Sequence, residues 1–126
     1  MSSTAFDCSK IDELMEKTIS EKCLVVFSFT TCHWCYKLKA ALHANAVPHH
    51  VVEIDKMNLS PEAKACMLQG LENRSGIVTV PQVFLDGKFV GGAAEIIPKA
   101  RNGQLYQDTQ ICIKKFAEYY EQLKNK

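Results

Sequence analysis

The sequence predicts an α/β domain in which helices cover both faces of a four-stranded mixed sheet. A short apolar run at residues 24–29, rich in β-formers, is typical of a strand that is buried on both faces. A helical pattern and a second strand-like run at residues 49–55 follow it, which is the order of a βαβ unit. Residues 81–86 and 88–90 are expected to form a hairpin around Asp86-Gly87. A βαβ unit that continues into a hairpin gives a mixed sheet.

A helix is predicted on either side of the first strand. Ser9 and Asp12 have the spacing of a capping box at the start of the first helix. The second helix is expected to begin after Cys32 and to end before Pro48. Apolar residues of the first helix recur at helical intervals, at Ile11, Leu14, Met15 and Ile19.

A third helix is predicted after the second strand. A capping serine, a proline at the first helical position and an acidic residue follow one another at residues 60–62. This helix is expected to run to about Leu71, and residues 73–76 are expected to form a loop.

Two helices are predicted after the hairpin. The Gly-Gly pair at residues 91–92 opens a short helix to about Ala100, and Gly103 interrupts the pattern. Asp108 is expected to cap the last helix. The inner side of that helix would carry Ile111, Phe116, Tyr119 and Leu123.

The bulk composition fits one domain that covers residues 1–126, with 47% hydrophobic and 23% charged residues. The 15 basic and 14 acidic residues leave a net charge of +1, so we expect neither nucleic acid nor a membrane as a partner. The longest apolar run, at residues 24–29, is far shorter than the roughly 20 residues of a membrane span. The first residues lack the basic and apolar regions of a secretory signal, and we therefore expect a cytoplasmic protein.

Cys32 and Cys35 form the one cysteine motif among six cysteines. Cys32 follows a buried strand and starts a helix, where unpaired N–H groups and the helix dipole favour the thiolate that acts in disulfide exchange. Cys35 lies one helical turn later, so its sulfur faces Cys32 and can resolve a mixed disulfide formed there. Trp34 is expected to be exposed beside this site, where its ring can stack on a substrate.

The two cysteines end the segment VFSFTTCHWC at residues 26–35, and three further segments follow it along the chain. They are TVPQVFL at residues 79–85, DGK at residues 86–88 and VGG at residues 90–92. In order and separation these segments resemble a dithiol glutaredoxin, a member of the thioredoxin-fold superfamily, over about residues 8–123. The resemblance implies the thioredoxin fold.

The resemblance also implies a glutathione-dependent thiol–disulfide oxidoreductase that reduces protein–glutathione mixed disulfides and protein disulfides. Cys32 would be the nucleophile and Cys35 the resolving cysteine. Pro81 would be a cis-proline that lets the backbone of Val80 pair with glutathione, and the helix that follows Gly92 would bind the γ-glutamyl end. The implied glutathione-binding residues are Trp34, Thr79, Val80, Pro81, Gly92, Ala93, Ala94 and Glu95.

The implied partners are glutathione and proteins that are glutathionylated or disulfide-bonded, and we expect a monomer. Several polar contacts of the family are missing. Phe29 replaces a lysine that attracts the glycine carboxylate of glutathione, and Val78 replaces an arginine before T-V-P. After Gly-Gly, Glu95 alone keeps the acidic character of the family. The cations available to compensate are Lys64, Lys37 and Arg74.

Two other functions stay open at this point. The missing glutathione contacts favour a thioredoxin-like dithiol reductase that uses another reductant. His33 replaces the proline of the motif, and some glutaredoxins that lack this proline bridge a [2Fe–2S] cluster between two subunits. No other metal is expected, because His49 and His50 point to opposite faces of a strand and do not complete a zinc site with the two cysteines.

The four remaining cysteines are scattered singly along the chain. Cys23 is expected to be a small core residue, and Cys66 and Cys112 to be single thiols on helices. Cys8, near the N-terminus, is expected to be available for oxidation between molecules.

Overall fold

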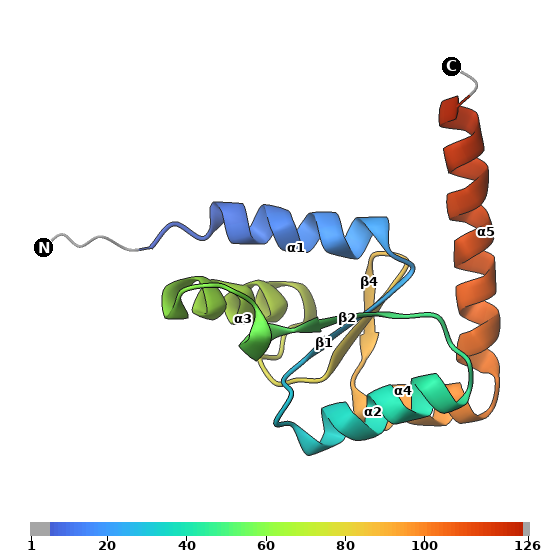
Figure 1. Cartoon of the computed structure of the whole chain (residues 1–126), viewed down its shortest axis with the longest axis horizontal. Coiled ribbons are helices and arrows are strands. Elements are labelled where there is room, and N and C mark those ends of the chain that lie inside the picture. The colour runs from blue at the N-terminus through green and yellow to red at the C-terminus, as the bar shows by residue number, and fades with distance from the viewer. Residues whose placement is uncertain (1–5, 125–126) are drawn as a thin grey trace, which may run out of the picture.

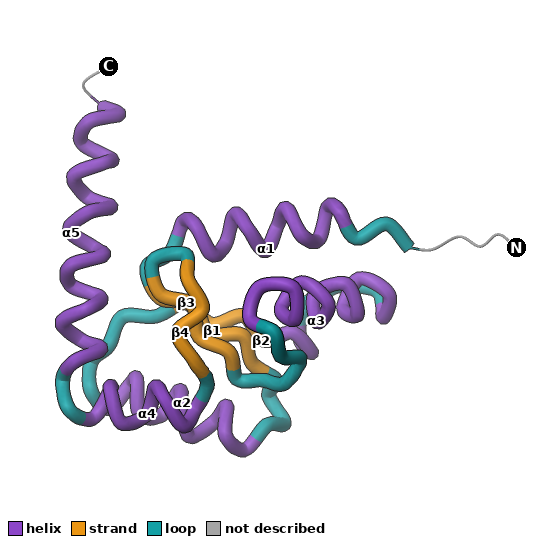
Figure 2. The backbone as a smooth tube through the Cα atoms, turned by 180° about the vertical axis from the view of Figure 1, so that it is seen from behind, coloured by secondary structure: helices purple, strands orange, loops and turns teal. Residues whose placement is uncertain are grey.

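The computed structural model describes residues 6–124 of the chain. Its strands form one sheet in the order β2-β1-β3-β4. β1 pairs in parallel with β2, and β3 pairs in antiparallel fashion with both β1 and β4 (Figure 2). The predicted mixed sheet is therefore confirmed. The strands are β1 (Leu24–Ser28), β2 (His50–Glu53), β3 (Gln82–Leu85) and β4 (Lys88–Gly91).

Helices cover both faces of this sheet, as predicted. In Figure 1, α1 and α3 lie above the sheet, and α2 and α4 lie below it. A fifth helix, α5, rises from the end of α4 along the side of the molecule, and its C-terminal end projects past the sheet. The helices are α1 (Ser9–Glu21), α2 (His33–Ala44), α3 (Pro61–Ser75), α4 (Ala93–Arg101) and α5 (Gln104–Lys124). Within the described residues, none of the helices is both long and apolar enough to cross a membrane.

The central strand β1 divides the core into two parts. Val25 and Phe27 pack with α1 and α3, whereas Leu24 and Val26 pack with α2 and α4. Each of these side chains is almost completely buried, and full burial of one such side chain stabilises the fold by about 1.5–3 kcal/mol. Burial on both faces explains why the run at residues 24–29 does not alternate with polar residues.

The boundaries of α1 and α3 differ from the prediction. Cys8 occupies the cap position of α1, so Ser9 is the first residue of the helix and not its cap, and the Ser9 N–H donates to the carboxylate of Asp7. Ser60 caps α3 as predicted by accepting a hydrogen bond from the N–H of Ala63. However, α3 continues past Leu71 to Ser75, so the predicted loop at residues 73–76 is wrong. The residue after the helix, Gly76, caps it with a φ of 85°, which favours glycine.

The second strand is shorter than the predicted residues 49–55. After β2 the chain turns through a short 3₁₀-helix, η1 (Ile54–Lys56), which buries Ile54 completely. The hairpin is confirmed, since Asp86 and Gly87 have φ angles of 51° and 84°, as a two-residue turn between twisted strands requires.

The last helix differs most from the prediction. It begins at Gln104, whose N–H donates to the side chain of Asn102, so Asp108 lies within the helix and is not its cap. Three of the four predicted inner residues are exposed: Ile111 and Tyr119 are more than 60% exposed, and Leu123 is 49% exposed. Phe116 is partly buried, as expected for the inner side. The inner side is short because the C-terminal half of the helix extends past the sheet (Figure 1). Its buried residues are Leu105, Thr109 and Cys112.

Candidate active site

The candidate nucleophile lies where β1 passes into α2. The N–H of Cys32 donates to the Phe29 carbonyl at 3.1 Å, which forms a tight turn after the strand. Cys32 is then the residue that caps α2, and its sulfur accepts the N–H of Cys35 at 3.2 Å. The first N–H groups of a helix have no partner within the helix, and the helix dipole is positive at this end. The start of α2 therefore directs N–H groups and the positive end of the helix dipole toward the Cys32 sulfur, which is partly exposed.

The second cysteine of the motif has the opposite environment. Cys35 is fully buried, and both cysteines of the motif are unpaired. Burial, and secondly the hydrogen bond with Cys32, raises the pKa of the Cys35 thiol to about 11 from an ordinary 9.0. Cys35 therefore stays protonated at neutral pH while Cys32 is positioned to attack.

A hollow lies beside Cys32, and Val80 and Pro81, which are joined by a peptide bond, are among the residues that line it. This bond is cis, as the resemblance implies, and the Cys32 sulfur lies 3.8 Å from the Val80 carbonyl oxygen. The structure brings all of the predicted glutathione-binding residues together around this hollow. Sequence reasoning missed one lining residue, Ile77. The hollow is lined by Trp34, Ile77, Thr79, Val80, Pro81, Gly92, Ala93, Ala94 and Glu95.

The two glycines before α4 let the backbone at the start of this helix lie close to Pro81. A Cβ atom on Gly92 would lie 3.0 Å from the Pro81 carbonyl oxygen. Gly91 has a φ of 139°, and a Cβ atom there would lie 2.7 Å from the Cβ atom of Glu95. The Glu95 carboxylate in turn accepts the N–H of Gly92 at 2.8 Å. This contact fixes the start of α4 beside the hollow and engages the carboxylate.

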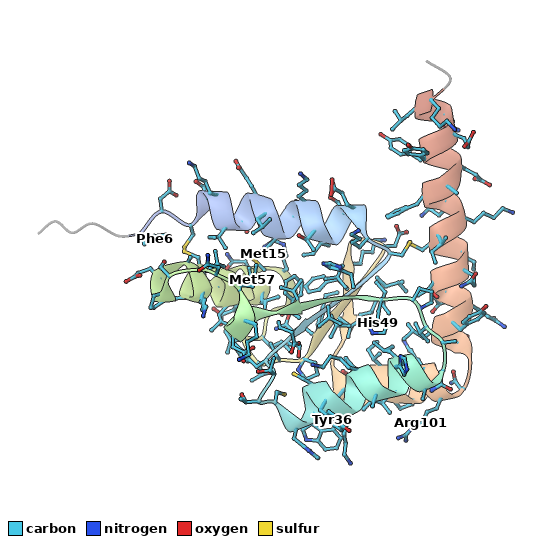
Figure 3. The ribbon with its side chains drawn as sticks, viewed as in Figure 1. Phe6, Met15, Tyr36, His49, Met57 and Arg101 are labelled. Carbon is cyan, nitrogen blue, oxygen red and sulfur yellow. A yellow bond between two sulfur atoms is a disulfide. The ribbon has the colours of Figure 1, made fainter. Side chains whose placement is uncertain are left out.

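The three cations considered as compensation lie in different places. Arg74 pairs with Asp12 at 2.8 Å and with Glu16 at 3.2 Å, so it fastens α3 to α1 and does not line the hollow. The Lys37 ammonium lies 5.3 Å from the centre of the Trp34 ring, close to the site. Tyr36, which precedes Lys37 in the sequence, points outward from α2 (Figure 3).

Lys64 lies close to a contact that the sequence did not reveal. Its ammonium donates to the Asp55 carbonyl oxygen at 3.4 Å. The Asp55 carboxylate accepts the Thr30 N–H at 3.0 Å and also accepts the Thr30 hydroxyl. These two hydrogen bonds lower the pKa of Asp55. They also hold the loop that leads into Cys32, two residues after Thr30.

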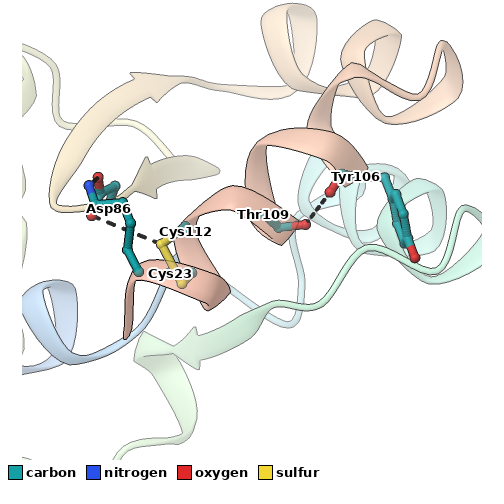
Figure 4. Close-up of a disulfide and its surroundings, with 6 residues drawn as sticks. Cys23, Asp86, Tyr106, Thr109 and Cys112 are labelled. Carbon is teal, nitrogen blue, oxygen red and sulfur yellow. Dashed lines mark hydrogen bonds and ion pairs between the residues drawn. A yellow bond between two sulfur atoms is a disulfide. The ribbon is translucent and has the colours of Figure 1, made fainter. Parts of the chain in front are cut away.

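The four scattered cysteines form two disulfides, which corrects the expectation of single thiols. Cys8 joins Cys66 and thereby links the start of α1 to α3, with Cα atoms 5.3 Å apart. Cys23 joins Cys112, with Cα atoms 5.7 Å apart, and links the start of β1 to α5 (Figure 4). The sequence signal was the even number of cysteines outside the motif, but sequence alone does not give the pairing.

No group of three or more His, Cys, Asp or Glu side chains within residues 6–124 is arranged to hold a metal ion. His49 and His50 line a different hollow, together with Ile113 and Phe116 from the middle of α5. Figure 3 places His49 near α5, away from Tyr36 in the first turn of α2.

Comparisons with known proteins agree with this geometry. The glutaredoxin family model matches residues 24–90, and the chain belongs to the glutaredoxin family. It is 32% identical over 98 residues to a mitochondrial glutaredoxin-2 of Mus musculus, a match that covers 78% of this chain and 60% of the relative. It is 35% identical over 97 residues to the chloroplastic glutaredoxin-C5 of Arabidopsis thaliana, covering 77% of this chain and 54% of that one. The chain thus spans little more than half the length of these relatives.

Solved structures show the same fold. A buckwheat glutaredoxin–glutathione complex superposes with a TM-score of 0.73 at 26% identity, covering 83% of this chain and 92% of that one. Oxidised glutaredoxin 2 from Chlamydomonas reinhardtii superposes with a TM-score of 0.71 at 29% identity, covering 83% and 95%. The thioredoxin fold inferred from the motifs is therefore confirmed.

Proposed function

We propose that the protein is a glutathione-dependent thiol–disulfide oxidoreductase in which Cys32 attacks disulfides and Cys35 resolves them. The observation that carries the proposal is the hydrogen bond from the Cys35 N–H to the Cys32 sulfur at the edge of the cis-proline hollow. It places one partly exposed sulfur and one buried, protonated sulfur three residues apart.

The reaction follows from these two environments. The Cys32 thiolate attacks one sulfur of a substrate disulfide, forms a mixed disulfide and releases the other sulfur as a thiolate. When the substrate is a protein disulfide, the Cys35 thiol transfers its proton to the released thiolate. The resulting Cys35 thiolate attacks the Cys32 sulfur, forms the Cys32–Cys35 disulfide and releases the second substrate sulfur as a thiolate, which takes a proton from water and leaves the substrate as a dithiol. Two glutathione molecules then reduce the Cys32–Cys35 disulfide and leave as glutathione disulfide.

The hollow suits the backbone of an extended thiol peptide. Among the described residues, the Val80 N–H has no hydrogen-bond acceptor, so it can pair with a peptide laid along residues 79–80. At the far end of the hollow the start of α4 offers N–H groups to a carboxylate. The related buckwheat protein was solved as a glutathione complex. Glutathione and glutathionylated or disulfide-bonded proteins are therefore the proposed partners.

One observation favours a second candidate, a dithiol reductase that draws electrons from another thiol. Phe29 and Val78 supply no charge where the family often has cations, and Arg74 is held by two carboxylates on α1. A weaker glutathione site would leave the dithiol chemistry of Cys32 and Cys35 intact.

The two candidates separate in a turnover experiment. Stopped-flow reduction of a glutathionylated peptide is followed with varied glutathione, using the wild type, Cys32→Ser and Cys35→Ser. Saturable turnover that survives Cys35→Ser but not Cys32→Ser supports the glutathione cycle. Slow turnover, with insulin still reduced through both cysteines, supports the second candidate. Turnover that survives Cys32→Ser contradicts both.

The cytoplasmic location stays a prediction. Disulfides such as Cys8–Cys66 and Cys23–Cys112 are more typical of oxidising compartments, and cytosolic proteins seldom keep them. Non-reducing electrophoresis of the protein taken directly from its native cells, after its thiols are blocked, would show whether these disulfides exist there.

A further inference from the structure

We propose that the hollow beside Cys32 selects an extended protein segment that carries large apolar side chains next to its reacting cysteine. The inference rests on the proposed function and names the substrate class for the same site. Two exposed apolar side chains carry it. Trp34 is 56% exposed and Ile77 is 43% exposed, and both line the hollow that contains Val80 and Pro81. We call Trp34 and Ile77 the apolar rim.

The rim is held in place on both sides. On the Ile77 side, the Ile77 N–H donates to the Ser75 hydroxyl at 3.1 Å. The proton of that hydroxyl is within reach of two carbonyls, those of Leu71 at 2.8 Å and Ile77 at 3.0 Å. The fully buried amide of Gln82 also donates to the carbonyls of Ile77 and Thr79, at 2.9 and 3.0 Å. Trp34 belongs to the first turn of α2. The apolar surface is therefore presented by an anchored backbone, which lowers the entropy lost when a partner binds.

The charges around the hollow favour an uncharged partner. Glu95 is the one charged residue among the described residues that line the hollow, and its carboxylate is engaged by the Gly92 N–H. The nearby Lys37 ammonium lies over the Trp34 ring. Few charged groups line the hollow, so a charged flank on the substrate would gain few ion pairs there, whereas an apolar flank would gain from burial against the apolar rim.

The reaction itself identifies the occupant of this surface. A substrate sulfur must reach bonding distance of the Cys32 sulfur, so the residues next to it must pass the rim. Pairing with the Val80 backbone would hold the segment extended, and side chains of an extended segment alternate in direction. Some flanking side chains must then face Trp34 or Ile77.

The test uses the full chain with Cys35→Ser, so that the mixed disulfide on Cys32 accumulates. The probes are peptides whose single cysteine is bonded to thionitrobenzoate, with two leucines or two serines on each side of the cysteine. The Cys32 thiolate attacks the peptide sulfur, forms the Cys32–peptide disulfide and releases coloured thionitrobenzoate. A third probe, glutathione bonded to thionitrobenzoate, reports the proposed function alone. Each rate is divided by the rate of the same probe with free N-acetylcysteine.

We expect the leucine peptide to react about tenfold faster than the serine peptide, since partial burial of leucine side chains is worth about one order of magnitude. Adding Ile77→Ser should reduce the ratio to about threefold or less, and Ile77→Leu should restore it. The matched control is Ile113→Ser, an exposed isoleucine on α5 that does not line this hollow. This control should leave the tenfold ratio unchanged.

The outcomes separate the two proposals. Equal peptide rates with a fast glutathione probe would overturn the inference and leave the proposed function standing. A preference for leucine that persists in Ile77→Ser at full strength would also overturn it. Failure of all three probes would overturn the proposed function and the inference together.

Discussion

Cys32 and Cys35 lie three residues apart at the start of one helix, whereas the other four cysteines pair over 58 and 89 residues of the chain. In the first pair the Cys32 sulfur is partly exposed and accepts a backbone N–H. In the other two pairs one partner is nearly buried: Cys66 is 5% exposed and Cys112 is 3% exposed. One residue type therefore serves two purposes in this chain. Local backbone donors make a reactive site, and long-range pairing joins elements that pack together.

Replacing the nucleophile Cys32 should have the largest effect of any single substitution on the reduction rate. Cys32→Ser replaces the sulfur that attacks and should lower the rate of glutathionylated-peptide reduction by at least about a thousandfold. Cys35→Ser, the matched control, should keep much of that rate and lose the reduction of protein disulfides to dithiols. Steady-state rates with both substrates measure this. Equal losses in the two variants would contradict the division of roles.

Removing a long-range pair should change stability and leave the chemistry in place. The double variant Cys23→Ala/Cys112→Ala should lower the free energy of unfolding by about 2–4 kcal/mol, because the disulfide closes a long loop in the unfolded chain. Urea unfolding followed by circular dichroism measures the change. The turnover rate should stay within about twofold of the wild type at 25 °C. A loss of turnover with unchanged stability would reverse the roles given to the two kinds of pair.

The buried thiol predicts how stability changes at alkaline pH. The folded state raises the pKa of Cys35 to about 11 from 9.0, so it holds the proton more tightly than the unfolded state does. This contribution to stability is fully present below pH 9 and is lost as the pH rises to about 11. The free energy of unfolding should therefore fall more steeply over this interval in the wild type than in Cys35→Ser. Parallel curves for the two proteins would show that Cys35 does not titrate as described.

The smallest effect is expected at the ion pairs that accompany the Cys8–Cys66 disulfide. Arg74→Met removes the contacts with Asp12 and Glu16, whose carboxylates are largely exposed, and should cost about 1 kcal/mol at low salt. In 1 M salt the difference between variant and wild type should shrink, because salt screens exposed pairs. Urea unfolding at both salt concentrations tests this. A cost several times larger would mean that these charges, and not the disulfide, hold α1 against α3.

The strands and the site could be predicted because their signals are local. The apolar run at residues 24–29, the turn at Asp86-Gly87 and the spacing of Cys32 and Cys35 each depend on a few neighbouring residues. The residues around the hollow came from the family resemblance, which carries their three-dimensional arrangement. Ile77 was missed because Gln82 and Ser75, not a motif, place it there.

The errors arose where distant parts of the chain decide the outcome. The pairing of Cys8 with Cys66 depends on how α1 meets α3, and nothing in the spacing of the two residues encodes it. Similarly, the apolar residues of α5 were expected to face inward, but only the first half of this helix meets the sheet. Helical periodicity shows which residues share a face and does not show how far the neighbouring layer extends.

The most direct test of the account is differential alkylation of the native protein. The protein is treated with glutathione at pH 7, labelled briefly with iodoacetamide, unfolded, labelled with a second reagent and digested without reduction. We predict the first label on Cys32, the second on Cys35, and linked peptides that contain Cys8–Cys66 and Cys23–Cys112. First label on Cys35 in preference to Cys32, or on any of the other four cysteines, would contradict the account.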